Sequence, residues 1–219
     1  MCVRYVLHKG DLYDWIERVE RKRGEKTVRS FYKMVEPGEA FPGEDGSIIR
    51  LRDGVLSLES AGWGLQPAWT DDPKFGRRNA YNARAETVFE KPSFRAAARQ
   101  RRCLLPATGF YERQSGRWLQ FRLKEGGGFA APGLFEEPNK SSDVATYTMI
   151  TTEPNEAVAQ VHDRMPVILD PDDYDAWLDP ATSVEELRSL LIPCPPEWFM
   201  IEDAGPIRVA KPEPPNLFD

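Results

Sequence analysis

The chain has 219 residues, of which 41% are hydrophobic and 29% are charged, a composition typical of a water-soluble globular protein. This length predicts one large domain that folds without disulfides or a structural metal. No uncharged apolar run approaches the ~18 residues that a membrane-spanning helix needs, and the N-terminus lacks the apolar core of a signal peptide. We therefore expect a cytoplasmic protein that acts as a monomer and has no membrane partner.

The cysteines and histidines are few and isolated. Three cysteines stand at positions 2, 103 and 194, and the odd count and wide spacing argue against a disulfide framework. The two histidines are His8 and His162, and the sequence contains no Cys-x-x-Cys pair. Because zinc sites usually show paired ligands at short spacing, we expect no metal or other cofactor.

The charge is unevenly distributed along the chain. The net charge of −6 argues against indiscriminate nucleic-acid binding. Residues 74–102 nevertheless carry nine basic and two acidic side chains, whereas residues 136–219 carry five basic and eighteen acidic ones. A basic block in an acidic chain fits either a phosphate-binding face or the solvated surface of a helix and a loop. Composition leaves both alternatives open.

The N-terminal part of the chain predicts short strands separated by Gly, Pro and Asp turns. Apolar residues alternate at 2–8, and an apolar stripe with helical period predicts a helix at 11–23. Further strands are predicted at 27–35, 47–51 and 55–58. Residues 62–69 predict a tight aromatic loop, and residues 71–79 predict an irregular polar loop.

The remainder predicts many short strands and a few helices. Predicted strands lie at 103–106, 109–112, 117–123, 129–135, 144–151 and 167–169. Predicted helices lie at 91–101, 154–160, 171–178 and 183–191, the last opened by the capping box Ser183-x-x-Glu186. This pattern indicates an α+β fold with a curved, barrel-like, mostly antiparallel sheet surrounded by short helices. We expect a single domain over residues 1–210 and a Pro-rich tail at 211–219.

Cys2 is the first candidate for chemistry. Removal of the initiator methionine, which is normal before a small residue, would make Cys2 the N-terminus. Its α-amine, with a pKa of ~8, would be partly neutral near pH 7 and able to form a Schiff base with an aldehyde. The neighbouring thiol can then close a five-membered thiazolidine ring. The alternative is that Cys2 is only the first buried residue of a strand.

Three further segments carry candidate residues. Asn82–Thr87 lies between the basic loop and a helix, and its simpler interpretation is a polar turn. Glu112 follows two aromatic residues, where a raised pKa would suit a general acid or base, although a surface glutamate is the common case. His162 lies two residues before Arg164, which combines a proton carrier with a phosphate-binding group, although a lone loop histidine is often structural.

Together these segments resemble the SRAP family, the SOS-response-associated peptidase-like proteins. The resemblance is close over residues 61–178. It rests on Cys2, Asn82–Thr87, Arg102–Glu112, Ile150–Glu153 and His162–Leu169, and it also covers Trp63–Trp69 and Lys91–Arg95.

The resemblance implies a protein that binds single-stranded DNA containing abasic sites and crosslinks to them. Cys2 would be the nucleophile that forms a thiazolidine with the opened sugar aldehyde. Asn82 would orient the N-terminal group or the sugar, Glu112 would act as general acid and base, and His162 would assist proton transfer. The resemblance also implies that Arg84 and Arg164 contact DNA phosphates. It implies less strongly that Arg4 contacts DNA and that Trp69 stacks on a base.

The sequence departs from the family pattern at several positions. Val3 replaces the usual glycine after the cysteine, and Arg113 replaces an aromatic residue after Phe-Tyr-Glu. The usual Tyr-Asn-x-Ala-Pro and Val-Ser-x-x-Val-Asn segments are not visible, and residues 31–42 and 207–210 stand in their places. Two alternatives therefore stay open: a cysteine peptidase or autoprocessing hydrolase with His162 as base, and a non-catalytic single-strand-binding paralogue.

Overall fold

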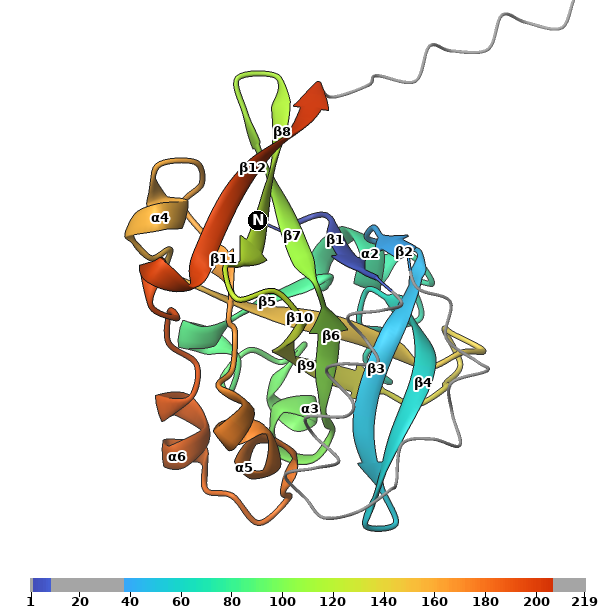
Figure 1. Cartoon of the computed structure of the whole chain (residues 1–219). Helices are drawn as coiled ribbons and strands as arrows, with labels where there is room; N and C mark the ends of the chain where they lie inside the picture. The colour runs from blue at the N-terminus through green and yellow to red at the C-terminus, as the bar shows by residue number, and fades with distance from the viewer. Residues whose placement is uncertain (1, 9–37, 207–219) are drawn as a thin grey trace, which may run out of the picture.

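The computed structural model describes residues 2–8 and 38–206 (Figure 1). The predicted helix at 11–23, the predicted strand at 27–35, most of segment 31–42 and everything after residue 206 lie outside these ranges. Among the residues described, no helix is both long enough and apolar enough to span a membrane.

The described chain contains many short strands and a few short helices. The strands are β1 (Tyr5–Leu7), β2 (Gly38–Ala40), β3 (Asp45–Arg52), β4 (Val55–Trp63), β5 (Asn82–Arg84), β6 (Arg102–Ala107), β7 (Gly109–Gln114), β8 (Arg117–Leu123), β9 (Phe129–Glu136), β10 (Thr146–Thr152), β11 (Met165–Pro166) and β12 (Phe199–Pro206). The α-helices are α2 (Phe75–Asn79), α3 (Arg95–Gln100), α4 (Glu156–Ala159), α5 (Tyr174–Leu178) and α6 (Val184–Ser189). The 3₁₀ turns are η2 (Ala85–Thr87), η3 (Pro171–Asp173) and η4 (Pro196–Trp198).

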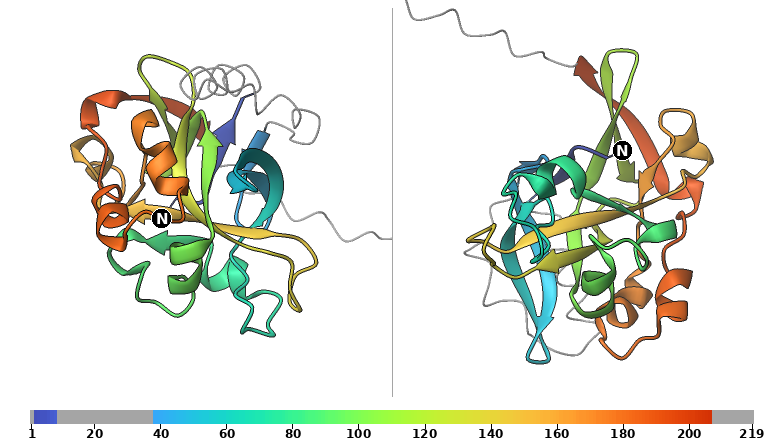
Figure 2. Two further views of the ribbon diagram at one scale, coloured as in Figure 1. Left: turned by 90° about the horizontal axis from the view of Figure 1, so that it is seen from below. Right: turned by 180° about the vertical axis from the view of Figure 1, so that it is seen from behind.

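The strands form two sheets, one of which closes on itself. In the larger sheet β10, β4, β3, β6 and β9 follow one another, and β9 pairs back onto β10 (Figure 1 and Figure 2). Strands β5 and β11 attach to β10, which pairs in parallel only with β4 and β5. The second sheet has the order β12-β8-β7-β1-β2, and all its pairs are antiparallel. The expected α+β fold with a barrel-like, mostly antiparallel sheet is therefore confirmed.

Both faces of the closed sheet are buried. Ile48 and Ile49 on β3 belong to different hydrophobic clusters, as do Leu105 and Leu104 on β6, because successive side chains point to opposite faces. The cluster of Ile49 and Leu104 also contains Trp177 and other residues of α3, α5 and α6, so it packs between sheet and helices. The cluster of Ile48 and Leu105 contains Cys2.

An aromatic group marks the position where β1 meets the closed sheet. The hydroxyls of Tyr5 and Tyr147 are hydrogen-bonded at 2.6 Å. The ring of Trp63 lies edge-on to Tyr5 at 5.1 Å and is stacked with Tyr147 at 6.1 Å between centroids. Gly46 on β3 faces this pair, and a Cβ there would overlap with both hydroxyls. The start of the chain is thus anchored against the sheet interior.

Several predicted loops and strands were wrong because distant contacts decide them. Strand β4 continues through Gly62 and Trp63, where it pairs with β10, so the predicted loop begins later. The predicted irregular loop at 71–79 contains α2, whose Gly76 amide donates to Gln66 Oε1 at 2.6 Å. Residues 167–169 form no strand: β11 precedes them, and Leu169 forms an isolated bridge with Ala130 of β9. Strands β2, β5, β11 and β12 were not predicted.

Candidate active site

Cys2 lies just before β1 and is held along β7. The carbonyl of Arg4 accepts hydrogen bonds from the Tyr111 amide at 2.9 Å and from the Cys2 thiol at 3.6 Å. The side chain of Cys2 is fully buried in the chain that begins with Met1. Burial, together with the charge of Glu112, raises the pKa of the Cys2 thiol well above its ordinary value, so the sulfur stays protonated.

Asn82 connects Cys2 to the closed sheet. It opens β5, which lies in parallel beside β10, with Asn82 opposite Met149. Asn82 Nδ2 donates to the carbonyl oxygen of Cys2 at 2.7 Å. Asn82 Oδ1 is buried and has no hydrogen-bond partner in the structure. The amide therefore fixes Cys2 with one end and presents an unused acceptor with the other.

Glu112 is a buried carboxyl on β7. Its side chain lies on the same side of the strand as Phe110, and the residue is only 2% exposed. Burial raises the pKa of Glu112 to about 7, and the negative charge of Asp163 acts in the same direction. Glu112 Oε1 is buried without a partner, so one oxygen remains available inside the site. A carboxyl that titrates near neutral pH suits a general acid and base.

His162 faces Glu112 from the loop that follows α4. The carbonyl of Gln160 accepts a hydrogen bond from Gln114 Nε2 at 2.8 Å, which ties this loop to the end of β7. His162 Nε2 lies 3.8 Å from Glu112 Oε2, and His162 Nδ1 accepts from the Arg164 amide at 3.0 Å. Burial lowers the pKa of His162, which favours the neutral ring.

The four residues predicted to be catalytic thus come together from four separate segments. A hydrogen bond joins Asn82 to Cys2, and a short distance joins Glu112 to His162. Glu112 also acts electrostatically on Cys2. The site contains a thiol, an acid–base carboxyl, a neutral imidazole and an amide, a set suited to addition and proton transfer at a carbonyl carbon.

The two predicted phosphate contacts differ in exposure. Arg84 is exposed at the end of β5, opposite Thr151 of β10. Arg164 is only 8% exposed, and its guanidinium donates to both carboxylate oxygens of Glu86 and to the carbonyl of Thr151. Arg84 has the geometry to meet a phosphate, whereas Arg164 would have to leave its present partners, so its phosphate role stays a prediction.

Arg4 and Trp69 lie in different surroundings. Arg4 forms an ion pair with Glu39, and its guanidinium lies 4.1 Å from the ring centroid of Tyr111. Trp69 is 56% exposed, and its ring packs edge-on against Phe75 at the start of α2, 5.1 Å between centroids. Trp69 therefore offers an open aromatic face, while Arg4 is largely committed to its neighbours.

Two departures from the family pattern, Val3 and Arg113, lie away from the Cys2 side chain. The side chain of Val3 packs with Val6, Tyr111 and Trp118, a cluster separate from the one that contains Cys2. Arg113 stacks over the Trp118 ring at 4.6 Å from its centroid. Both departures from the family pattern thus lie on the side of the sheet away from the thiol.

The basic block is divided between interior and surface. Arg102 is buried and donates to the carbonyls of Ala98, Arg99, Trp177 and Asp179. Arg101 pairs with Glu136. The exposed members of the block include Lys74, Arg77, Arg78, Arg84, Lys91 and Arg95. Only this exposed part is available to a polyanion.

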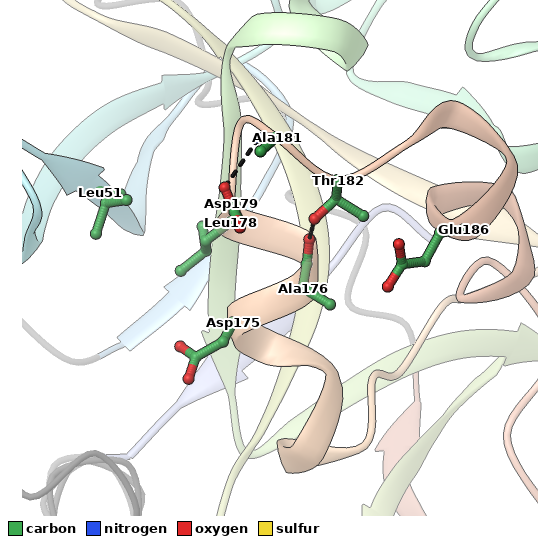
Figure 3. A pocket seen from close by; sticks show the side chains of 8 residues that line it. All are labelled: Leu51, Asp175, Ala176, Leu178, Asp179, Ala181, Thr182 and Glu186. Atoms are coloured by element: carbon green, nitrogen blue, oxygen red, sulfur yellow. Dashed lines mark hydrogen bonds between the residues drawn. The ribbon is translucent and has the colours of Figure 1, made fainter.

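A separate pocket lies where β3 approaches α5 and α6 (Figure 3). Its volume is about 570 Å³, and its lining includes the acidic residues Asp175, Asp179 and Glu186. None of the eight predicted site residues lines it. Its acidic lining is unsuited to a phosphate backbone.

Sequence reasoning overlooked Glu86 and Asp163 as members of the site. Both lie inside segments that resemble the family, Asn82–Thr87 and His162–Leu169, but neither was predicted to have a role. Glu86 pairs with Arg164 across 78 positions of sequence, and Asp163 Oδ1 lies 3.0 Å from His162 Nδ1. The sequence offered one signal for Glu86: it lies two residues after Arg84, in the segment Asn82–Thr87 that resembles the family.

Comparisons with known proteins agree with the architecture. The SRAP family model, described as SOS response associated peptidase, matches residues 1–204. The "Abasic site processing protein YoaM" of Bacillus subtilis is 45% identical over 206 residues, which cover 88% of this chain and 86% of that protein. The "Abasic site processing protein HMCES" of Gallus gallus is 32% identical over 151 residues, covering 53% of this chain and 44% of that protein. A crystal structure of a protein from Bacteroides thetaiotaomicron has a TM-score of 0.73 at 28% identity, over 86% of this chain and 87% of that one. The chain belongs to the SRAP family.

Proposed function

We propose that this protein captures abasic sites in single-stranded DNA through a covalent link to Cys2. The observation that carries the proposal is the meeting of Cys2, Asn82, Glu112 and His162 in one buried site. The relatives named abasic site processing proteins support the same class of substrate. The activity depends on removal of Met1, because only then does Cys2 carry a free α-amine.

The proposed chemistry is a condensation that releases one water. The closed sugar opens when the C1′ hydroxyl loses its proton and the ring oxygen gains one, and Glu112 and His162 exchange these protons. The α-amine of Cys2 adds to the resulting aldehyde, and water leaves to give a Schiff base. The thiol sulfur then adds to the imine carbon while its proton moves to the nitrogen, which closes the thiazolidine.

The environment of the thiol distinguishes this chemistry from that of a cysteine peptidase. A peptidase nucleophile is a thiolate activated by a neighbouring base or positive charge. Here burial and Glu112 raise the pKa of Cys2, and His162 Nε2 faces Glu112. These contacts oppose formation of a thiolate, and in the proposed step the thiol gives its proton to the nitrogen as the sulfur adds to the imine. The hydrolase assignment is the less supported alternative.

The proposed DNA surface combines exposed cations with one exposed aromatic ring. Arg84 lies on β5, the strand that also carries Asn82, so a phosphate bound there would be near the reacting sugar. Stacking of a base on Trp69 contributes ~1–3 kcal/mol without reading sequence. Both contacts suit a single strand whose bases are unpaired.

We also propose that residues 1–210 form one monomeric domain, with 211–219 as a tail. Light scattering coupled to size-exclusion chromatography checks the monomer. Truncation after residue 210 is expected to leave the melting temperature unchanged, and a large drop would assign the tail to the domain.

The decisive experiment is intact mass spectrometry before and after incubation with an abasic single-stranded oligonucleotide. We expect the protein to lack Met1 and the product to weigh the sum of both reactants less one water. Cys2→Ala should abolish the SDS-resistant adduct, whereas Cys194→Ala, which removes another buried thiol, should retain it. A chain that binds the oligonucleotide but forms no adduct would instead be the non-catalytic paralogue. Peptide turnover without an adduct would establish the hydrolase.

A further inference from the structure

An ion pair between Glu86 and Arg164 lies beside His162. Glu86 belongs to η2, directly after the strand that carries Asn82 and Arg84. Arg164 Nη1 donates to Glu86 Oε1 at 2.6 Å, and Arg164 Nη2 donates to Glu86 Oε2 at 3.0 Å. This two-point contact fixes the plane of the guanidinium as well as its position.

Arg164 also holds the backbone on both sides of the site. Its Nη2 donates to the carbonyl of Thr151 on β10 at 2.7 Å. Its own amide donates to His162 Nδ1 at 3.0 Å. One residue therefore links η2, β10 and the imidazole, and the Glu86 carboxylate balances its nearly buried charge.

The contact with the Arg164 amide favours one of the two tautomers of the neutral imidazole. A ring nitrogen that accepts an amide hydrogen bond cannot itself be protonated, so the Arg164 amide places the proton on Nε2. That nitrogen faces Glu112 Oε2 at 3.8 Å. Asp163 Oδ1 lies 3.0 Å from Nδ1 and favours a proton on Nδ1. The Asp163 side chain is 86% exposed, however, so solvent weakens its electrostatic interaction with the ring.

We propose that Glu86 is a positioning residue for His162: by holding Arg164, it keeps the loop in place and the proton-bearing Nε2 of the imidazole directed at Glu112. The effect on crosslinking rests on the proposed function, whereas the effect on the imidazole does not. Arg164 thereby has a task inside the protein that needs no contact with phosphate.

The imidazole is directly observable. The chain has only two histidines, so nitrogen-15 NMR of the ring nitrogens gives two sets of signals, and His162→Ala assigns them. We expect the wild type to show the Nε2–H form of His162 and Glu86→Gln to show a mixture with the Nδ1–H form. The control is Glu90→Ala, which removes a carboxylate from an exposed ion pair with Arg188 and should change nothing. An unchanged tautomer in both Glu86→Gln and Glu86→Ala would overturn the proposal.

A double-mutant cycle tests the consequence for chemistry. The rate constant for adduct formation at saturating abasic DNA is compared among wild type, Glu86→Gln, His162→Ala and the double variant. We expect Glu86→Gln to slow the wild type by about tenfold to a hundredfold, since misplacing a reacting group by 1 Å costs about that much. In the His162→Ala background the same change should cost nothing further. Equal losses in both backgrounds would contradict action through His162.

An affinity control and a charge-conserving variant separate the remaining outcomes. In a Cys2→Ala background, binding of abasic single-stranded DNA measured by fluorescence anisotropy should be unchanged by Glu86→Gln. A loss confined to affinity would show that the pair serves DNA binding and would overturn the proposal. Glu86→Asp, which keeps the charge, should restore part of the rate and the tautomer. If the wild type forms no adduct, the proposed function fails while the NMR measurement still decides the role of Glu86.

Discussion

Asn82 Nδ2 donates a hydrogen bond of 2.7 Å to the carbonyl oxygen of Cys2, although 80 positions of sequence separate the two residues. Two independent strand pairings make this contact possible. The pairing of β1 with β7 directs the start of the chain into the site, and the pairing of β5 with β10 brings Asn82 to it. The amide of Asn82 therefore acts on the residue whose α-amine is proposed to react.

Asn82→Ala is expected to slow adduct formation more than it weakens DNA binding. The substitution removes the donor to Cys2 and the buried, unpartnered Oδ1, so the N-terminal residue loses its orientation. Loss of orientation costs up to about 10²-fold in rate. Single-turnover kinetics at saturating abasic DNA measures it, with Asn79→Ala at an exposed position as the control. Equal rates for the two variants would remove Asn82 from the proposed chemistry.

Glu112→Gln is expected to stabilise the fold at high pH while it abolishes acid–base catalysis. The pKa of Glu112 is raised from 4.5 to about 7, so the folded state holds a proton that the unfolded state releases between these values. Its contribution to stability is complete below pH 4.5 and is lost as the pH rises through 7. Glutamine never ionises, so the variant should gain up to about 3 kcal/mol above pH 7.

Denaturant unfolding at pH 8 and at pH 4.5 measures the difference between Glu112→Gln and the wild type. The gain should be large at pH 8 and should disappear at pH 4.5. The same pKa predicts that the wild-type crosslinking rate changes with pH near 7, and the variant should keep only the dependence that the Cys2 α-amine contributes. A stability difference independent of pH would show that Glu112 is not the titrating group.

Gly46→Ala is expected to destabilise the protein where β1, which follows Cys2, packs against the closed sheet. The new Cβ would overlap with the hydroxyls of Tyr5 and Tyr147, which are hydrogen-bonded to each other. Overpacking of this kind costs about 1–3 kcal/mol. Thermal unfolding measures the loss, and Gly38→Ala, which meets open space, is the matched control. Equal melting temperatures for the two variants would mean that the tyrosine pair tolerates the added methyl group.

Local patterns predicted the elements whose causes are local. Strand β8 was predicted with its observed bounds from its apolar members Trp118, Phe121 and Leu123, and a tight turn at Ser115 and Gly116 precedes it. The N-cap of α6 was also predicted, and Ser183 Oγ accepts from the Glu186 amide at 3.1 Å. The cap of α6 joins residues three positions apart, whereas β8 pairs with β7 across a tight turn and also with the distant β12.

Long-range pairing accounts for what the patterns did not predict. Strand β5 has three residues and exists because it lies beside β10, so Asn82–Arg84 carried no strand signal of its own. The same holds for the ion pair of Glu86 with Arg164, since opposite charges 78 positions apart are not paired by any local rule. The four candidate catalytic residues were assembled through a family resemblance, and their distances came only from the fold.

Arg84→Ala is expected to weaken binding of single-stranded DNA and to lower its salt dependence. Arg84 is exposed beside the site, so each phosphate it neutralises should release about one counterion. The slope of log affinity against log salt should therefore fall by about one in a Cys2→Ala background. Arg188→Ala is the matched control, because it removes the same charge from an exposed pair with Glu90. If both variants change the slope equally, the effect reflects net charge, and Arg84 makes no specific phosphate contact.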